Sequence, residues 1–596
     1  METNEKKKNW VVGELINPEA QKAEISRFEE EIRNLEQRKL DPDDFKKFRL
    51  ENGVYGIRGT MDEHMIRIKV RFGALTADQL DAVADIVEKY ATPKVAHVTT
   101  RQAIQLHKVK RGNVPEALKA IVKTGLTTRE ACGNTVRNVS ACPISGISAE
   151  ELFDVTPYAD AVSRYFLRHP VCQNLPRKFK IAFEGCPTDH ARVPIHDFGA
   201  VAKIKTVDGK PVRGFATTVG GGLGAVPFQP HLLEEFTPED LLIPTIETVM
   251  RLFDRYGERK NRAQARIKFL IKKWGIEEFR RQFVEERKVT LMTSPGQTDW
   301  KIPVYSQEAP PPPPAQKGLT VAQETPEYRR WMKTNLVPQK QTGFVAVQVR
   351  CLLGDIGVPQ MRGVAELSRK FNGGRLRTVI SQNLLLPWVR QESVPALYEG
   401  LQRLGIATAD AGSLADITRC PGADTCQIAI THSRGLAASF GEIFSNGGRE
   451  LVDDEALKNL SIKISGCYNS CGQHHIADIG FQGAASELNG HTVPHYMIQV
   501  GGGTSEGVAR FGHRLGMVPA KRVPEAARKL LELYRAERQE KEGFRQWVER
   551  VGPDRLKNEM DPFRTLPPFE QAREMYEDLG AQGEFKLEVG KGECAS

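Results

Sequence analysis

The segment Met65-Ile-Arg-Ile-Lys-Val-Arg71 decides the fold, because apolar and basic side chains alternate along it. Ile66, Ile68 and Val70 share one side, which predicts a strand with one apolar and one basic face. The elements expected next are a helix opening at Thr76 with a capping box to Gln79, a strand over 95–107 and a helix over 114–125. The unit is therefore predicted to be β-α-β-α, with Thr99, Arg101, Gln105 and His107 on one face of its second strand.

The same pattern occurs again later in the chain. The matching segments are 344–350, 358–371, 378–389 and 394–405. In both copies a Val-Pro pair opens the last helix at the same distance from a closing glycine. The sequence therefore predicts an internal duplication.

The two copies differ in the chemistry of matched positions. The pairs, first copy named first, are Arg67 and Ala346, Lys69 and Gln348, Arg101 and Gln382, Gln105 and Leu386, and His107 and Trp388. We infer that the basic face of the first copy forms an anion-binding wall. The more apolar face of the second copy is expected to form a floor that leads to the cysteine pairs described next. The alternative is a solvated sheet face, but a difference between two copies of one unit favours function.

Two cysteine pairs follow the second copy: Cys420-Pro-Gly-Ala-Asp-Thr-Cys426 and Cys467-Tyr-Asn-Ser-Cys471. Four thiolates in two close pairs can hold one cubane iron–sulfur cluster, and the glycines around them suit tight turns. Zinc is the competing metal, but structural zinc sites mostly use a shorter spacing than the first pair has. Four buried small thiols with no metal are the remaining alternative.

The spacing C-x5-C and C-x3-C at these cysteines resembles the signature of the sirohaem-containing sulfite and nitrite reductases, of the assimilatory, ferredoxin-dependent type. The resemblance implies an α+β fold: pseudo-two-fold duplicated ferredoxin-like half-domains plus two larger α/β domains for sirohaem and [4Fe–4S]. It also implies that Cys420, Cys426, Cys467 and Cys471 bind the cluster, and that Cys471 joins the cluster to the sirohaem iron.

The resemblance assigns further residues to the site. Sulfite and nitrite are small oxyanions, so their site needs lasting positive charge, which arginine supplies, and transferable protons, which lysine supplies. The residues that match the family's distal-pocket motifs are Arg67, Arg137, Lys178 and Lys180. The residues expected to bind the eight carboxylates of sirohaem are Arg101, Gln105, His107 and Arg177.

The expected organisation follows the duplication and the run Pro310–Pro314, which reads as a stiff connector. The expected parts are an N-terminal arm (1–60), the first half-repeat (61–128), the first α/β domain (129–308), a linker (309–340), the second half-repeat (341–408), the cluster domain (409–550) and a tail (551–596).

The composition restricts the class of protein and its cellular compartment. The chain has 596 residues, ten cysteines and a net charge of +9. With a charged start and no long apolar run, these features predict a cytoplasmic protein in which thiols bind metal or stay free. The lone cysteines, Cys142, Cys172, Cys186 and Cys351, show no ligand spacing and are expected in the core. No basic run with interleaved aromatics is present, so nucleic acid is not an expected partner.

The most specific predictions concern the substrate and the electron donor. The motif L-P-R-K-x-N, with asparagine at its last position, is typical of plant-type nitrite reductases. This chain has a second lysine, Lys180, at that position, which favours sulfite. We therefore predict six-electron reduction of sulfite to sulfide. Without a flavin or nicotinamide fingerprint, ferredoxin is the expected donor, or else a flavodoxin or flavoprotein. The alternatives are a ferredoxin-dependent nitrite reductase on the same centre and a non-catalytic iron–sulfur electron carrier.

Overall fold

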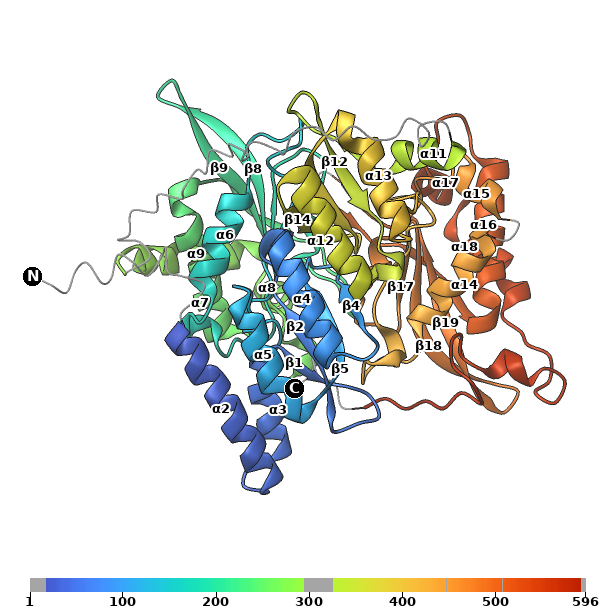
Figure 1. Ribbon diagram of the computed structural model, residues 1–596, viewed down its shortest axis with the longest axis horizontal. Coiled ribbons are helices and arrows are strands. Elements are labelled where there is room, and N and C mark those ends of the chain that lie inside the picture. Colours follow the sequence, from blue (N-terminus) through green and yellow to red (C-terminus); the bar gives the residue numbers. More distant parts are fainter. Residues whose placement is uncertain (1–17, 294–324, 446–447, 506, 591–596) are drawn as a thin grey trace, which may run out of the picture.

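The computed structural model describes residues 18–293, 325–445, 448–505 and 507–590. The first half of the chain, blue to green in Figure 1, lies beside the second half, yellow to red. The run Pro310–Pro314 lies outside the described residues. Among the described helices, none is long and apolar enough to cross a membrane.

The first half-repeat contains the predicted elements, but the predicted second strand is wrong. The elements are β1 (Val54–Gly56), β2 (Glu63–Ile68), β3 (Ala74–Thr76), α4 (Ala77–Tyr90), β4 (Val95–Val98), β5 (Ile104–Lys110) and α5 (Val114–Lys123). In place of one strand over 95–107, antiparallel β4 and β5 form a hairpin. Gln102 adopts φ +54°, and the Thr99 hydroxyl accepts hydrogen bonds from the backbone N–H groups of Arg101 and Ala103. These local bonds reverse the chain, so Arg101 lies in a turn.

The second half-repeat has the same order of elements, with three strands, a helix, two strands and a helix, and one further helix precedes it. Its elements are α11 (Pro326–Asn335), β11 (Leu336–Pro338), β12 (Phe344–Val349), β13 (Asp355–Gly357), α12 (Val358–Asn372), β14 (Arg375–Thr378), β15 (Leu384–Arg390) and α13 (Val394–Arg403). Gln382 adopts φ +71° in its turn, as Gln102 does in the first, so the predicted match of Gln382 with Arg101 is wrong by one residue. The strand pairs Arg67–Gln105 and Gln348–Leu385 likewise match Arg67 with Gln348 and Gln105 with Leu385, instead of with Ala346 and Leu386 as predicted. The predicted capping box at Thr76 and Gln79 is confirmed at the start of α4. The predicted duplication is therefore a duplication in space, with a hairpin in each copy.

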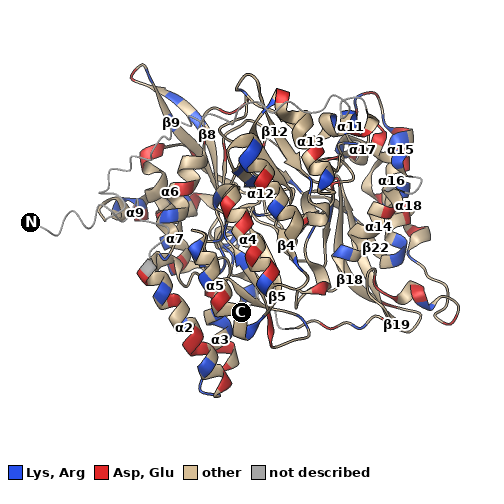
Figure 2. Ribbon diagram, in the orientation of Figure 1, with Lys and Arg blue, Asp and Glu red and all other residues tan. Residues whose placement is uncertain are grey.

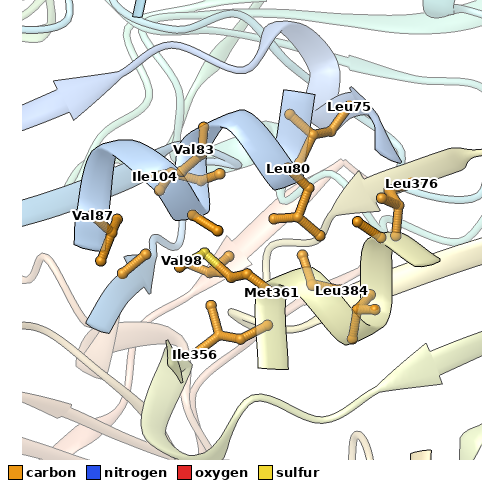
Figure 3. Close-up of a cluster of buried hydrophobic side chains, with 14 of the residues drawn as sticks. Leu75, Leu80, Val83, Val87, Val98, Ile104, Ile356, Met361, Leu376 and Leu384 are labelled. Atoms are coloured by element: carbon orange, nitrogen blue, oxygen red, sulfur yellow. The ribbon is translucent and has the colours of Figure 1, made fainter. Parts of the chain in front are cut away.

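The two half-repeats exchange strands and share one core. β3 of the first pairs with β14 of the second, and β13 of the second pairs with β4 of the first. Figure 3 shows Leu80, Val83 and Val87 of α4 beside Met361 of α12, with side chains of both sheets around them. Because this apolar surface is buried by both halves together, their relative position is fixed by packing rather than by a linker.

Each half-repeat is followed by a larger domain with a five-stranded sheet. The first sheet has the order β10 (His231–Pro238), β9 (Lys210–Val219), β8 (Phe198–Val207), β7 (Ile181–Glu184), β6 (Ser140–Ala141). The second has the order β16 (Thr418–Arg419), β17 (Ile462–Ser465), β18 (Ile479–Leu488), β19 (His491–Val500), β22 (His513–Pro519). In both, the first three strands in chain order are parallel neighbours and the later ones antiparallel. The duplication therefore extends beyond the half-repeats.

Helices cover these sheets, and both ends of the described chain pack on the body. The helices of the larger domains are α6 (Thr156–Phe166), α7 (Leu242–Tyr256), α8 (Ile267–Trp274), α9 (Ile276–Leu291), α14 (Ser433–Ser445), α15 (Arg449–Asp453), α16 (Val523–Glu537), α17 (Phe544–Val551) and α18 (Pro553–Glu559). A short ribbon, β20 (Gly503–Ser505) and β21 (Val508–Arg510), follows β19. The N-terminal arm forms α2 (Pro18–Glu36) and α3 (Pro42–Glu51), and it buries Phe28 in the core of the half-repeats.

Candidate active site

A cavity of about 600 Å³ lies where elements of both halves meet. Its basic lining residues are Arg67, Arg101, Arg137, Arg177, Lys178, Lys180, Arg262, Arg266, Lys268 and Arg419. None of the described residues that line it is acidic. Elsewhere, by contrast, acidic and basic residues alternate along helices such as α2 (Figure 2). The cavity therefore collects positive charge without matching carboxylates in its lining, as a site for a polyanion requires.

Arg67 and Arg137 are held next to each other by a shared tyrosine. Arg67 Nη1 donates to the Tyr55 hydroxyl at 2.8 Å, and Arg137 Nη1 donates to the same oxygen at 3.3 Å. With its amide oxygen turned toward the guanidinium, Gln105 accepts from Arg67 Nε at 3.0 Å. Arg137 also donates to the carbonyl of Gly133. Several fixed contacts thus orient two guanidinium groups at the cavity, and the anion-binding role of this wall stays a prediction.

Arg101 is placed by the hairpin turn between β4 and β5. Its guanidinium donates to the carbonyl of Asn138 at 2.6 Å, while the Asn138 amide donates to the carbonyls of Val70 and Arg101. Burial, and after it the nearby Arg137, lowers the pKa of Arg101 to about 9. A guanidinium that is held this firmly among other cations is stabilised when an anion enters.

Lys180 lies at the start of β7 next to a buried ion pair. Its backbone N–H donates to Asp197 Oδ2 at 2.9 Å, and Arg266 Nη2 lies 2.7 Å from the other oxygen of that carboxylate. Burial, followed by Arg101 and Arg266, lowers the pKa of Lys180 well below its ordinary value. Burial and Arg266 likewise lower the pKa of Lys268 to about 7. An anion that enters the cavity would therefore favour the charged forms of Lys180 and Lys268.

The four paired cysteines lie close to one another, and two of them line the cavity. Burial raises the pKa of Cys426, and the neighbouring thiols of Cys467 and Cys471 raise it further. Cys420 Sγ accepts from the backbone N–H of Gly466 at 3.2 Å. Glycine is needed there, because a Cβ on Gly466 would lie 2.6 Å from a backbone oxygen. Thiolates with a backbone N–H donor between them are the environment that an iron–sulfur cluster uses.

Cys471 is the cysteine that faces the cavity most openly. It is the one exposed cysteine among those that the structure describes. Cys420 also lines the cavity, whereas Cys426 and Cys467 lie behind it. The hydroxyl of Thr100, in the first hairpin turn, donates to the carbonyl of Cys471 at 3.0 Å. The basic wall of one half and the cysteine segment of the other are therefore in direct contact, and the residues present fit both a polycarboxylate macrocycle and a cluster.

Nine of the twelve predicted site residues line the cavity. The three that do not are His107, Cys426 and Cys467. The nine are Arg67, Arg101, Gln105, Arg137, Arg177, Lys178, Lys180, Cys420 and Cys471. His107 packs edge-on against His97, which does line the cavity, with ring centroids 6.4 Å apart. Burial, and then His97, lowers the pKa of His107 to about 3. The structure therefore places His107 behind His97, not on the cavity surface.

Three supporting residues were missed in the sequence. They are Tyr55, which bridges two arginines, and the pair of Asp197 and Arg266 beneath Lys180. A signal for Asp197 exists, because Ile195-His-Asp-Phe-Gly199 is repeated as Ile476-Ala-Asp-Ile-Gly480. The described end of the tail was also missed, since Val589 and Gly590 reach the cavity.

Comparison with known families agrees with this geometry. The family "Nitrite and sulphite reductase 4Fe-4S domain" matches residues 132–291 and 411–563. The family "Nitrite/Sulfite reductase ferredoxin-like half domain" matches residues 58–123 and 337–404. The two families alternate along the chain, as the two copies of the fold do.

Individual relatives cover most of the chain. An assimilatory ferredoxin-dependent nitrite reductase of Haloferax mediterranei is 30% identical over 528 residues, which are 86% of each chain. A ferredoxin sulfite reductase of Mycolicibacterium paratuberculosis is 27% identical over 83% of each chain. The solved structure of the Mycobacterium tuberculosis NirA protein matches with a TM-score of 0.73 and 26% identity, over 87% of this chain and 92% of that one. The protein is thus an oxidoreductase of the nitrite and sulfite reductase family, and its cofactors are a sirohaem and a [4Fe–4S] cluster.

Proposed function

We propose that this protein is a ferredoxin-dependent sulfite reductase that carries out the six-electron reduction of sulfite to sulfide. The observation that carries the proposal is the position of Lys180, buried in the cavity among Arg101, Arg266 and Lys178. Burial, and after it these cations, lowers the pKa of Lys180, so an anion in the cavity is needed to stabilise the charged form of this lysine. Sulfite, which approaches two negative charges at neutral pH, compensates more of this charge than nitrite does.

The residues of the chain divide the work between binding, orientation and proton transfer. In this proposal Arg67 and Arg137 hold the oxyanion throughout turnover, because arginine keeps its charge. Lys178 and Lys180 supply protons as the oxygens leave as water. Arg101, Gln105 and Arg177 bind the cofactor carboxylates. Cys420, Cys426, Cys467 and Cys471 hold the cluster, Cys471 on the cavity side, and the coupled cofactors supply the electrons.

Nitrite is the second candidate substrate, because both activities are represented among the relatives. The Haloferax mediterranei relative, at 30% identity, is a nitrite reductase, and the Mycolicibacterium paratuberculosis relative is a sulfite reductase. Steady-state kinetics separates the two: we expect a higher kcat/KM for sulfite. A kcat/KM for nitrite far above that for sulfite would assign the chain to nitrite instead.

The variant Lys180→Asn is expected to shift the preference between the two oxyanions. Loss of a buried charged donor costs about 1.5–3 kcal/mol, so kcat/KM for sulfite should fall roughly 10–100-fold relative to that for nitrite. The matched control is Lys273→Asn, at an exposed lysine outside the cavity lining, which should leave the ratio unchanged. If Lys180→Asn leaves the ratio as it is in the wild type, Lys180 does not select the substrate.

Electron delivery is proposed to come from ferredoxin, an acidic protein that the net charge of +9 would attract. Activity with reduced ferredoxin should therefore fall several-fold as the salt concentration rises, since screening weakens attraction beyond about 8–10 Å at physiological ionic strength. The comparison assay uses a small-molecule reductant, for which the dependence should be weaker. Equal salt dependence with both donors would contradict electrostatic docking.

A further inference from the structure

A second cluster of ligand-type side chains lies outside the active-site cavity. Cys142, Glu184, Cys186 and His190 bring one ligand atom each to within 4.8 Å of one another. None of the four lines the cavity, and the first three are almost fully buried. Cys142 and Cys186 lie far apart in the sequence, and the fold brings them together. Thiol, imidazole and carboxylate together are a typical ligand set for a zinc-class cation.

Two parallel strands position the cluster. Cys142 directly follows β6, and its N–H donates to the carbonyl of Phe183 in β7 at 2.9 Å. Cys186 follows the end of β7, and its Sγ lies 3.4 Å from the Ser148 hydroxyl. Cys142 and Cys186 are therefore presented by adjacent strand ends, and strands hold ligands more precisely than loops do.

Glu184 fixes the loop that carries Cys186 and His190. One carboxylate oxygen accepts from the backbone N–H of Cys186 at 2.9 Å, and the other accepts from that of Ala191 at 2.8 Å. His190 Nδ1 lies 3.9 Å from the first oxygen. A carboxylate offers about four acceptor positions, so capacity remains for a cation after the bonds that brace this loop.

The duplication relates this cluster to the iron–sulfur ligands. Cys142 and Ser148 have the spacing of Cys420 and Cys426, and Cys186 and His190 have the spacing of Cys467 and Cys471. Each set follows matching strands, β6 and β7 in one sheet and β16 and β17 in the other. The cluster thus occupies the position in the first half that the [4Fe–4S] ligands occupy in the second.

The spacing of the atoms favours one ion over a cubane. Within the described chain, the four iron–sulfur cysteines do not form a group as tight as 4.8 Å, whereas the first-half set does. A single zinc ion needs ligands at about 2.0–2.3 Å, which brings them as close together as these are. Ser148 replaces the thiol that a cubane would need at the fourth corner.

We propose that Cys142, Cys186, His190 and Glu184 bind one zinc ion, in a structural site that is the counterpart of the iron–sulfur site. The ion would clamp the loops after β6 and β7. The first of these loops also meets the second half, because Arg377 donates to the carbonyls of Pro143 and Ser145 at 2.8 and 2.7 Å. The proposal does not depend on whether sulfite or nitrite is the substrate.

Metal analysis of the purified holoenzyme tests the proposal. After growth with added zinc and dialysis against a chelator, we expect about one zinc per chain in addition to the iron, with zinc–sulfur distances of about 2.3 Å in X-ray absorption. The variant His190→Ala should lose most of this zinc, because it removes one of four ligands from a partly exposed position. Iron content and the sirohaem absorbance should remain at wild-type levels.

Two further variants keep the result interpretable. His190→Cys supplies another zinc ligand and should retain the ion, whereas Cys351→Ala, at a buried thiol outside the cluster, should behave as the wild type. The proposal is overturned if wild-type and His190→Ala proteins hold the same amount of zinc, or if mass spectrometry finds Cys142 and Cys186 joined as a disulfide in the folded holoenzyme.

Discussion

The variant Cys471→Ser is expected to lose sulfite and nitrite reduction together, by at least about three orders of magnitude in kcat, as when a group that acts as part of a unit is removed. Cys471 is the exposed cysteine of the four and lies at the cavity. Its segment also contacts the first hairpin turn through Thr100. Serine has nearly the same size but is a poor ligand for iron, so the loss should come from the metal centre and not from packing. Activity with a small-molecule reductant and the iron content per chain measure the effect.

The control for this prediction is Cys351→Ser, which changes a buried cysteine outside both ligand groups. It should retain its iron content and nearly all its activity. If Cys471→Ser turned over sulfite or nitrite within about tenfold of the wild type, the thiol would not be part of the electron path.

The second large effect is expected from Arg67→Met, which removes a cation from the cavity while keeping much of the side-chain volume. Loss of one preorganised donor at a site of charge costs about 10²–10³-fold, so kcat/KM should fall by that amount for both oxyanions. Arg67 is oriented by Tyr55 at 2.8 Å and by Gln105. Arg67→Lys should recover only part of the activity, because lysine cannot make the same fixed pair of contacts.

A matched control uses the same substitution at an exposed arginine. Arg403, at the end of α13 in the second half-repeat, lies outside the cavity lining, and Arg403→Met should be silent. The sirohaem content of Arg67→Met should match that of the wild type. A normal kcat/KM in a fully loaded Arg67→Met protein would show that the oxyanion does not use this guanidinium.

Much of the fold could be predicted because its signals are local. Alternation around Ile66 gives a strand, and the Thr76 capping box gives the start of α4. The hairpin was missed because 95–107 is strand-like throughout, and only the Thr99 hydroxyl bonds and the positive φ of Gln102 show the reversal. A turn that is stabilised by hydrogen bonds to a hydroxyl, inside a strand-like segment, is hardly marked by residue composition. The alternating pattern therefore predicted one strand across the turn.

The candidate-site residues that belong to a sequence motif could be predicted. Those that are brought together only by the tertiary structure could not. Arg67, Arg137 and Lys180 matched motifs of the resembling family and do line the cavity. The role of Tyr55 depends on two arginines that are far apart in the sequence, so no spacing rule could find it. His107 alternated with Gln105 in the expected way, but it packs behind His97, a residue on the paired strand.

The proposed zinc site is the clearest case of a sequence signal that was present but not used. Cys142 and Cys186 were expected in the core, and both are buried. Alignment of the first half with the iron–sulfur ligands of the second would have singled them out, since the spacing of the cysteine pairs is repeated there. In a duplicated chain, a motif in one copy is thus a reason to inspect the matching positions of the other.

The central claim is that one coupled centre, a sirohaem joined to a cluster through Cys471, lies under a wall of fixed cations. The most direct measurement is the visible absorption spectrum of the purified wild type beside that of Cys471→Ser, together with iron counts. The account predicts sirohaem bands and cluster absorption in the wild type, and a changed sirohaem spectrum in the variant. A wild-type protein without sirohaem bands, or a variant whose spectrum is unchanged, would contradict it.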